Sequence, residues 1–322
     1  MINLCMRFRR PIAILFFALL LVPALARAQT SQSASAPPPL GPHPRVLIVV
    51  AHPDDESCFS ATVYEITHNI GGSVDQLIIT NGEGGYRYSL LAEGYYHEPL
   101  TNEAVGRAML PDIRKREVLE AGDILGITTH FFLDERDVRY TLDIDEVLTQ
   151  HWNAPLVLAD VKHRLEVGKY DFVFTLFPSA DTHGAHKAAT ITALNAIAEM
   201  QGDKPVVLAC QDGSSTSATP LDWTGFQSAQ HPYTVAPQRY SVDRSVKFGF
   251  NNVMDYQIIA NWVIAAQKSQ GAFQMGVNEV DKEEFAILDA ATPSDAAKAD
   301  QLFHSLSDTA AHPVPLRPPN SP

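Results

Sequence analysis

Continuous hydrophobic runs alternate along the chain with segments in which hydrophobic residues recur every three or four positions. The runs predict buried strands at 45–51, 74–80, 130–133, 171–177 and 206–210. The intervening segments predict helices at 57–69, 112–125, 143–167 and 186–200, with a break at Pro155 in the third. This order predicts an α/β fold with a mainly parallel, Rossmann-like sheet and helices on both faces.

The pattern after residue 211 is less regular. Residues 240–250 indicate extra strands or a hairpin, and residues 255–273 indicate one long helix. We expect a single domain over 45–311, preceded by a flexible Ser-, Ala- and Pro-rich linker at 29–44 and followed by a tail at 312–322.

The first 28 residues are typical of a secretory signal peptide. Three arginines within residues 7–10 precede an apolar stretch at 11–24, and Ala26-Arg27-Ala28 fits a cleavage site. The stretch is shorter than the roughly 20 residues of a membrane-spanning helix. We therefore expect an exported protein, periplasmic or secreted, with no stable membrane span after cleavage.

Charge and cysteine content narrow the possible partners. The formal net charge is −13, and the predicted signal peptide removes four arginines and no acid. Such an acidic chain is not expected to bind nucleic acid. Cys58 and Cys210 each adjoin a hydrophobic run, so we expect separate buried thiols, although the sequence leaves a disulfide open.

Ionisable residues gather where two predicted strands end. "AHPDDE" follows the first strand and contains His52, Asp54 and Asp55, while "DTHGAH" follows the fourth and contains His183 and His186. The carboxyl ends of parallel strands meet at one edge, so these side chains should lie close together. One aspartate could instead cap a helix, and the histidines could be solvated. Together they offer the two-histidine, one-carboxylate set of an open zinc site, and spacing does not decide which members bind.

These motifs resemble the PIG-L/LmbE family of zinc-dependent N-acetylglucosaminyl de-N-acetylases. "AHPDDE", the loop "TNGEGG" and "RKREVLEAGDILGI" at 114–127 occur in the family's order, within residues 45–198. The resemblance implies that zinc is held by His52, Asp55 and His186. It also implies that Asp54 is the base for zinc-bound water and that His183 stabilises the oxyanion or protonates the leaving amine.

Substrate contacts are predicted at the same edge of the sheet. The resemblance makes Arg114 a candidate sugar-binding residue, and Glu83, Arg87 and Asp134 are further candidates in neighbouring loops. The aromatic segment 85–97 could close over a sugar or pack as an ordinary loop. Asp134, Glu135 and Asp137 follow the third strand and could contact sugar hydroxyls or form a solvated turn.

Two positions depart from the family pattern. Ala185 stands where the family usually has an acid that could tune His183, and Asp181 could partly replace that acid. Gln267 stands where the family often has a histidine, two residues before Ser269-Gln270.

The sequence thus predicts an exported zinc hydrolase that removes an N-acetyl group from an amino-sugar or glycoconjugate. The alternatives are a zinc amidase or esterase with a non-sugar acyl substrate and a non-catalytic carbohydrate-binding protein on the same fold. The acceptor sugar and the oligomeric state are left open.

Overall fold

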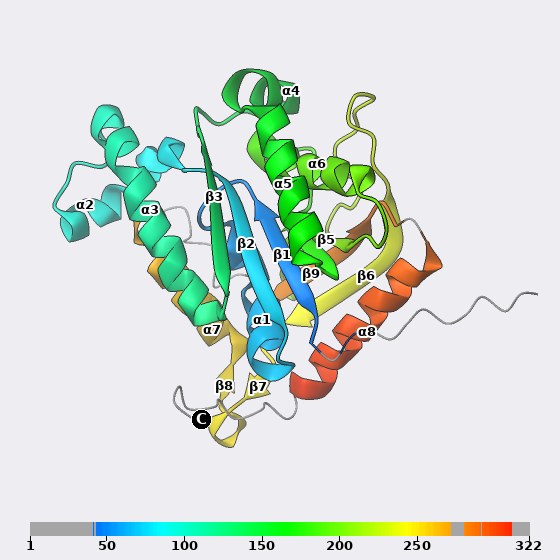
Figure 1. Cartoon of the computed structure of the whole chain (residues 1–322). Helices are drawn as coiled ribbons and strands as arrows, with labels where there is room; N and C mark the ends of the chain where they lie inside the picture. The colour runs from blue at the N-terminus through cyan, green and yellow to red at the C-terminus, as the bar shows by residue number, and fades with distance from the viewer. Residues whose placement is uncertain (1–40, 42, 272–279, 291, 311–322) are drawn as a thin grey trace, which may run out of the picture. The chain divides into compact units, whose positions relative to one another are not determined.

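A computed structural model describes residues 41, 43–271, 280–290 and 292–310, drawn in colour in Figure 1. These residues belong to one compact unit, 37–322, and the other unit, 1–36, lies outside the described residues. The predicted signal peptide, nearly all of the linker and the tail at 312–322 therefore also lie outside them. None of the helices among the described residues is long and apolar enough to span a membrane.

A seven-stranded sheet in the order β3-β2-β1-β4-β5-β9-β6 forms the centre of the unit. Its strands are β1 (Arg45–Val50), β2 (Ser73–Thr80), β3 (Thr129–Glu135), β4 (Phe172–Leu176), β5 (Val206–Gly213), β6 (Val235–Asp243) and β9 (Lys282–Leu288). The first five are parallel, and β9 pairs antiparallel with both β5 and β6. The predicted mainly parallel α/β fold is therefore confirmed.

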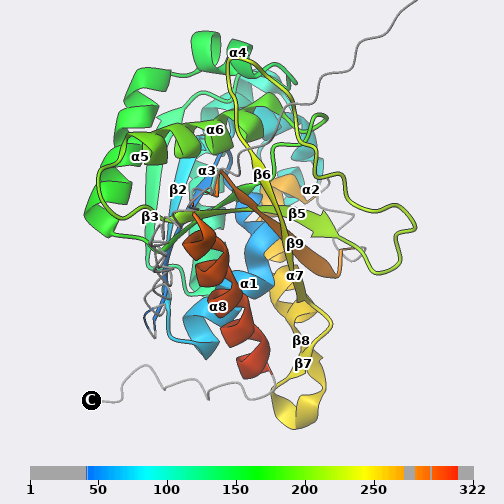
Figure 2. The same ribbon diagram turned by 90° about the vertical axis from the view of Figure 1, so that its right-hand side faces the viewer.

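Helices cover both faces of the sheet (Figures 1 and 2). The α-helices are α1 (Ser60–Tyr64), α2 (Leu90–Tyr96), α3 (Glu103–Leu125), α4 (Ile144–Glu146), α5 (Ala154–Gly168), α6 (Gly184–Glu199), α7 (Tyr256–Ala266) and α8 (Pro293–Ala310). Strand side chains alternate between two cores: Ile48 packs with α1, α3, α7 and α8, whereas Val49 packs with α4, α5 and α6. Burial on both faces explains why these strands are continuous hydrophobic runs.

Short helical turns and a small hairpin complete the described chain. The turns are η1 (Asp55–Phe59), η2 (Glu65–Asn69), η3 (Glu83–Tyr88), η4 (Val147–His151), η5 (Phe250–Asn252) and η6 (Lys268–Gln270). The hairpin pairs β7 (Lys247–Phe248) with β8 (Met254–Asp255). Both structures predicted for 240–250 occur, because 240–243 belongs to β6, an edge strand of the main sheet, and 247–248 is one strand of the hairpin.

Two helix predictions were wrong in extent. Helix α3 begins at Glu103, where the Asn102 side chain caps it, and continues through Pro111 instead of starting after it. Chain 255–273 is not one long helix, since α7 ends at Ala266. Strand β9 and helix α8 were not predicted. Packing against the sheet evidently outweighs local propensity here.

The strand order reverses between β1 and β4, which are adjacent in the sheet. Chain leaving β1 crosses to β2 and β3, while chain leaving β4 crosses to β5 on the other side. Such a switch point opens a crevice at the carboxyl ends of the strands. The two predicted polar clusters follow these two strands.

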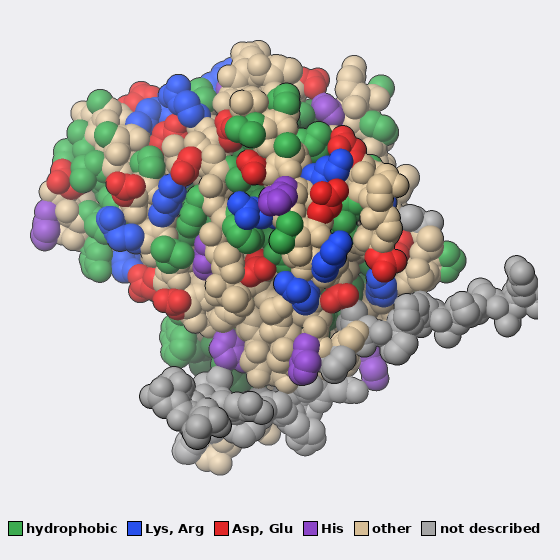
Figure 3. Space-filling model, viewed as in Figure 1, with side chains coloured by type: hydrophobic (Ala, Val, Ile, Leu, Met, Phe, Trp, Pro, Cys, Tyr) green, Lys and Arg blue, Asp and Glu red, His purple; other side chains and the backbone are tan. Residues whose placement is uncertain are grey.

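The molecular surface mixes charges of both signs. Figure 3 shows acidic and basic side chains interspersed on the face viewed there, with scattered hydrophobic ones between them. On this face, the acidity of the chain is therefore not concentrated in one patch. Cys58 and Cys210 are free and buried, and the thiol of Cys210 donates to the Cys58 carbonyl at 3.3 Å.

Candidate active site

The loop after β1 fixes Asp55 through the main chain. Its Oδ2 accepts hydrogen bonds from the amides of Ala51 at 3.0 Å and His52 at 2.9 Å. Burial alone would raise the pKa of Asp55, but His186 and His52 outweigh burial and hold the pKa well below its usual value. Asp55 is thus an ionised carboxylate with a fixed orientation.

The crevice brings His52, Asp55 and His186 together although His186 lies 134 residues beyond His52. His52 Nδ1 is 3.0 Å from His186 Nε2, which is 3.3 Å from Asp55 Oδ1. The other carboxylate oxygen, Asp55 Oδ2, lies 3.7 Å from His52 Nδ1. The predicted three residues therefore form one cluster of donor atoms.

This donor set fits zinc. Ligand atoms about 2.0–2.1 Å from a tetrahedral ion lie roughly 3.3 Å apart, close to the separations found here. Thr182 Oγ1 lies 3.1 Å from His186 Nδ1, which leaves Nε2 free to face the cluster. A three-histidine set is also possible, because His52, His183 and His186 offer nitrogens within 4.8 Å of one another. The set with Asp55 is more compact.

Asp137, which the sequence offered only as one of three acids that could contact a sugar, lies near Nε2 of His52. His52 Nε2 is buried and makes no hydrogen bond, and Asp137 Oδ1 lies 3.8 Å from it. Burial would lower the pKa of His52, but Asp137 and Asp55 raise it to about 10. Asp134 and Glu135 lie at the end of β3, and Asp137, just beyond it, is the one of the three acids that reaches the site. Alternation along the strand would put Glu135 and Asp137 on the same side, so it could not single out Asp137.

Asp54 has a different environment from Asp55. Its φ is 139°, a strained value for a residue with a side chain, and its amide donates to Glu56 Oε2 at 3.1 Å. Its carboxylate is 8% exposed and lies 2.9 Å from Arg114 Nη2. Burial raises the pKa of Asp54 to about 6, with Arg114 opposing the rise and Asp55 adding to it. Such a carboxylate is ionised at neutral pH yet is a stronger base than a solvated one.

Arg114 supports the loop that carries Asp54. The side chain is 2% exposed and also donates to the carbonyls of Pro53 at 2.5 Å and Gly82 at 2.7 Å. Gly82 has a φ of 69°, and a Cβ there would collide with the Arg114 guanidinium. The predicted sugar contact by Arg114 is not favoured by this burial, which indicates that Arg114 positions Asp54.

The other predicted substrate contacts are engaged within the protein. Glu83 is buried and accepts from the Asp137 amide at 2.8 Å, and Arg87 donates to the Tyr86 hydroxyl at 3.0 Å. Asp134 lies 2.5 Å from Lys115 Nζ. Their contact with a sugar stays a prediction.

The aromatic segment 85–97 forms η3 and α2. Tyr86 is buried and packs with Leu100, Leu110 and Ile113, while the Tyr96 hydroxyl donates to Glu117 at 2.7 Å. The predicted closure over a sugar stays untested. The ring that stacks on His183 is Tyr140, from the loop after β3.

His183 lies at the start of α6. Its Nε2 is 3.2 Å from the Arg139 carbonyl, so it donates there and leaves Nδ1 available to a substrate. Burial, followed by the charges of His52 and His186, lowers the pKa of His183 to about 4. The Asp181 carboxylate accepts from Ser179 at 2.7 Å, and its partial replacement of the acid missing at Ala185 stays a prediction.

Gln267, the second departure, reaches the loop after β1. Its amide donates to Glu56, which also accepts from Gln76 at 3.2 Å and from the Asp54 amide. Burial, then the charge of Asp54, raises the pKa of Glu56 to about 8. Gln267 therefore stabilises the strained turn at Asp54.

The PIG-L family model, described as GlcNAc-PI de-N-acetylase, matches residues 47–197. This segment contains His52, Asp54, Asp55, His183 and His186, so the resemblance indicated by the motifs is confirmed. Over these residues the chain is similar to the PIG-L family.

Several solved structures are similar to the chain at low sequence identity. N,N'-diacetylchitobiose deacetylase from Pyrococcus horikoshii is 17% identical with a TM-score of 0.49, and the match covers 77% of this chain and 86% of that one. Teicoplanin deacetylase Orf2 is 15% identical with a TM-score of 0.49, covering 76% and 97%. GalB, the 4-carboxy-2-hydroxymuconate hydratase from Pseudomonas putida KT2440, is 16% identical with a TM-score of 0.46, covering 78% and 97%. These likenesses are too distant to carry an argument about the reaction. No curated protein matches the chain.

Proposed function

We propose that the protein is an exported, zinc-dependent hydrolase that removes an N-acetyl group from an amino-sugar derivative. The observation that carries this proposal is the triangle of His52, Asp55 and His186 beside a second, separately held carboxylate, Asp54. The PIG-L match over 47–197 supports the substrate class. Export rests on the sequence of residues 1–28 alone.

His52, Asp55 and His186 would hold the metal. Bound zinc would polarise the acetyl carbonyl and make a water molecule acidic enough to attack at neutral pH. Asp54, with a pKa of about 6, accepts the proton of the attacking water. Arg114 keeps Asp54 oriented, and the Asp54–Glu56 contact preserves the turn.

His183 acts on the other side of the reacting carbonyl. With Nε2 donating to the Arg139 carbonyl, the neutral ring presents an unprotonated Nδ1, so His183 can receive the proton that Asp54 has taken from the water. Once protonated, His183 stabilises the oxyanion or passes this proton to the amine that leaves with the sugar. Acetate and a free amine are the products.

The test combines metal analysis with acetate release. Purified protein should hold one zinc per chain and release acetate from N-acetylated amino sugars faster than from simple esters. Faster cleavage of esters or non-sugar amides would favour the alternative amidase or esterase. Stoichiometric zinc without hydrolysis of any of these would show a binding protein and overturn the proposal.

A further inference from the structure

The chain between β3 and α4 is attached to the start of α6 at several residues. The Arg139 carbonyl lies 3.2 Å from His183 Nε2, and the Thr141 carbonyl accepts from the Gly184 amide at 2.6 Å. The Leu142 carbonyl accepts from Lys187 Nζ at 3.1 Å. These three contacts to the start of α6 hold the loop beside the site.

Side-chain packing adds to these backbone contacts. Lys187 is only 3% exposed and also donates to the Ala180 carbonyl at 2.7 Å, so it joins the loops after β3 and β4. A Cβ at Gly184 would lie 2.8 Å from the Asp143 carbonyl oxygen, which requires a glycine there. The loop is therefore a fixed wall of the crevice, not a lid.

Tyr140 provides a fourth contact between this loop and the start of α6. Its ring stacks on His183, with centroids 4.9 Å apart and planes inclined by 14°. His183 in turn stacks on His52, with centroids 5.3 Å apart. The three rings form a column that runs from the buried metal ligand to the surface.

The outer end of this column is open. Tyr140 remains 65% exposed although it packs on His183. The neighbouring Leu142 is 49% exposed, so the wall presents an aromatic ring and an aliphatic side chain at the mouth of the site. Single exposed apolar side chains are common on protein surfaces, so what distinguishes Tyr140 is its stacking on His183.

We propose that Tyr140 is a specificity-determining residue that stacks against the sugar ring next to the one that loses its acetyl group. This inference rests on the proposed function and adds that the substrate is an oligosaccharide or glycan chain rather than a single amino sugar. Aromatic rings bind ligands that have one apolar face and a polar rim, and a pyranose ring has this character. Tyr140 packs on the outer side of His183, the histidine that transfers the proton, so its ring can contact the sugar next to the one that reacts.

The experiment compares two substrates and three variants. N-acetylglucosamine and its disaccharide are tested with Tyr140→Ala, Tyr140→Phe and Tyr95→Ala. Tyr95 is a matched control, because it is 62% exposed on α2 and its ring contacts Tyr96 and Lys268. Both tyrosines are exposed, so neither change should alter folding, which thermal unfolding checks.

For Tyr140→Ala we expect KM for the disaccharide to rise about fivefold to tenfold, with kcat and the monosaccharide KM unchanged. Tyr140→Phe should behave as the unmodified protein, because the ring carries the contact, and so should Tyr95→Ala.

An equal rise of KM for both substrates, or a fall in kcat for both, would show that Tyr140 acts through His183 and would overturn the inference. The same effect in Tyr95→Ala would also overturn it. If the unmodified protein releases no acetate from either sugar, the proposed function is wrong and the inference falls with it. Acetate release that is unaffected by Tyr140→Ala refutes the inference alone.

Discussion

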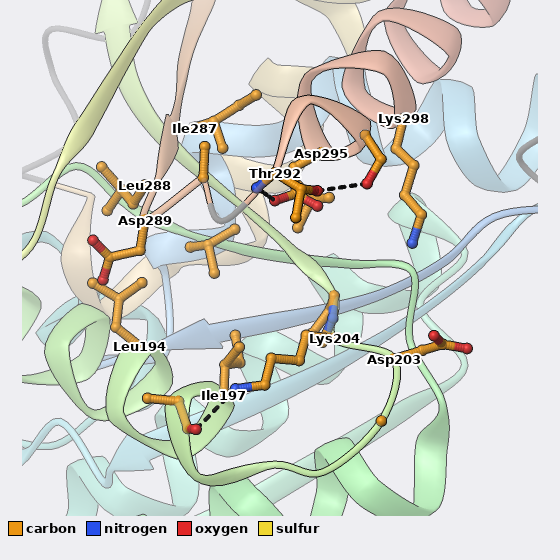
Figure 4. A pocket seen from close by; sticks show the side chains of 17 residues that line it. Leu194, Ile197, Asp203, Lys204, Ile287, Leu288, Asp289, Thr292, Asp295 and Lys298 are labelled. Carbon is orange, nitrogen blue, oxygen red and sulfur yellow. Dashed lines mark hydrogen bonds between the residues drawn. The ribbon is translucent and has the colours of Figure 1, made fainter. Parts of the chain in front are cut away.

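The two ends of the parallel sheet differ in how their polar groups are satisfied. At the amino end of β5, a cavity of about 440 Å³ lies between α6, β9 and α8 (Figure 4). Its rim carries lysines and aspartates, yet Lys204 donates to the Ala198 carbonyl and Asp289 accepts from Thr234. At the carboxyl end, His52 Nε2 lacks a hydrogen bond and Asp54 is strained.

This difference teaches that a cavity does not by itself mark the reactive site. The cavity at the amino end has an apolar floor and a rim of mixed charge, which selects no obvious ligand class. The carboxyl end instead concentrates buried ionisable groups whose pKa values are pushed apart, which is the signature of a functional site. Substitutions at the carboxyl end should therefore change activity more than substitutions at the amino end.

The largest effects are expected at the adjacent aspartates Asp54 and Asp55, where the two substitutions should change different properties. Asp54→Asn should lower kcat by about 10²–10⁴-fold while zinc remains bound, because the variant loses only the base. Asp55→Asn should weaken zinc binding by at least about 100-fold, because it removes a ligand. Metal analysis after dialysis and acetate release distinguish the two. Equal loss of zinc in both variants would contradict the assigned roles.

A smaller effect is expected at Arg114. Arg114→Met removes the positive charge that lowers the pKa of Asp54, so that pKa rises and the acidic limb of the kcat/KM profile moves to higher pH. Arg114→Lys keeps the charge but cannot serve both Pro53 and Gly82, and should cost about 10- to 100-fold in kcat with a smaller shift. Identical pH profiles for the two variants would argue against charge as the cause.

Stability of the carboxyl end should depend on Glu283. This buried carboxylate accepts from the Ala61 and Thr62 amides at the start of α1 and from Arg244 at 2.8 Å. Glu283→Gln should lower the free energy of unfolding by about 3–5 kcal/mol, measured by denaturant titration. The neighbouring Glu284→Gln, which loses a contact with Ser241, should cost less than about 1 kcal/mol. Comparable losses would show that Glu283 is not a specific anchor.

The free energy of unfolding should depend on pH through the ionisation of Glu65, in the turn η2. Burial, and then the charge of Glu283, raises the pKa of Glu65 from 4.5 to about 8. The folded state therefore holds a proton that the unfolded state releases. The resulting stabilisation is present below about pH 4.5 and is lost as pH rises through 8. Thermal unfolding between pH 5 and 9 should show a smaller decline for Glu65→Gln; an unchanged slope would exclude this group.

The smallest effect is expected at the cavity. Lys298→Met changes a lining side chain at the amino end of the sheet, far from the histidine cluster in the topology. It should alter kcat/KM for acetate release by less than about twofold, since it touches none of the proposed reacting groups. A tenfold fall would show that the two ends are coupled.

Local pattern determined much of the fold in advance. Hydrophobic runs located the five parallel strands because burial on both faces requires continuous apolar sequence. The course of α3 through Pro111, the end of α7 and the strand β9 could not be predicted, since packing against distant elements decides them.

By itself, the sequence placed His52, Asp54, Asp55, His183 and His186 at two strand ends, because parallel strands end at a common edge. Only the tertiary structure showed which atoms face one another: Asp55 turned to the histidines, Asp54 held by Arg114, and Tyr140 stacked on His183. The structure alone likewise showed that Asp137 lies beside His52. Spacing along a chain fixes which edge a residue reaches, but side-chain direction and pKa depend on neighbours that are remote in sequence.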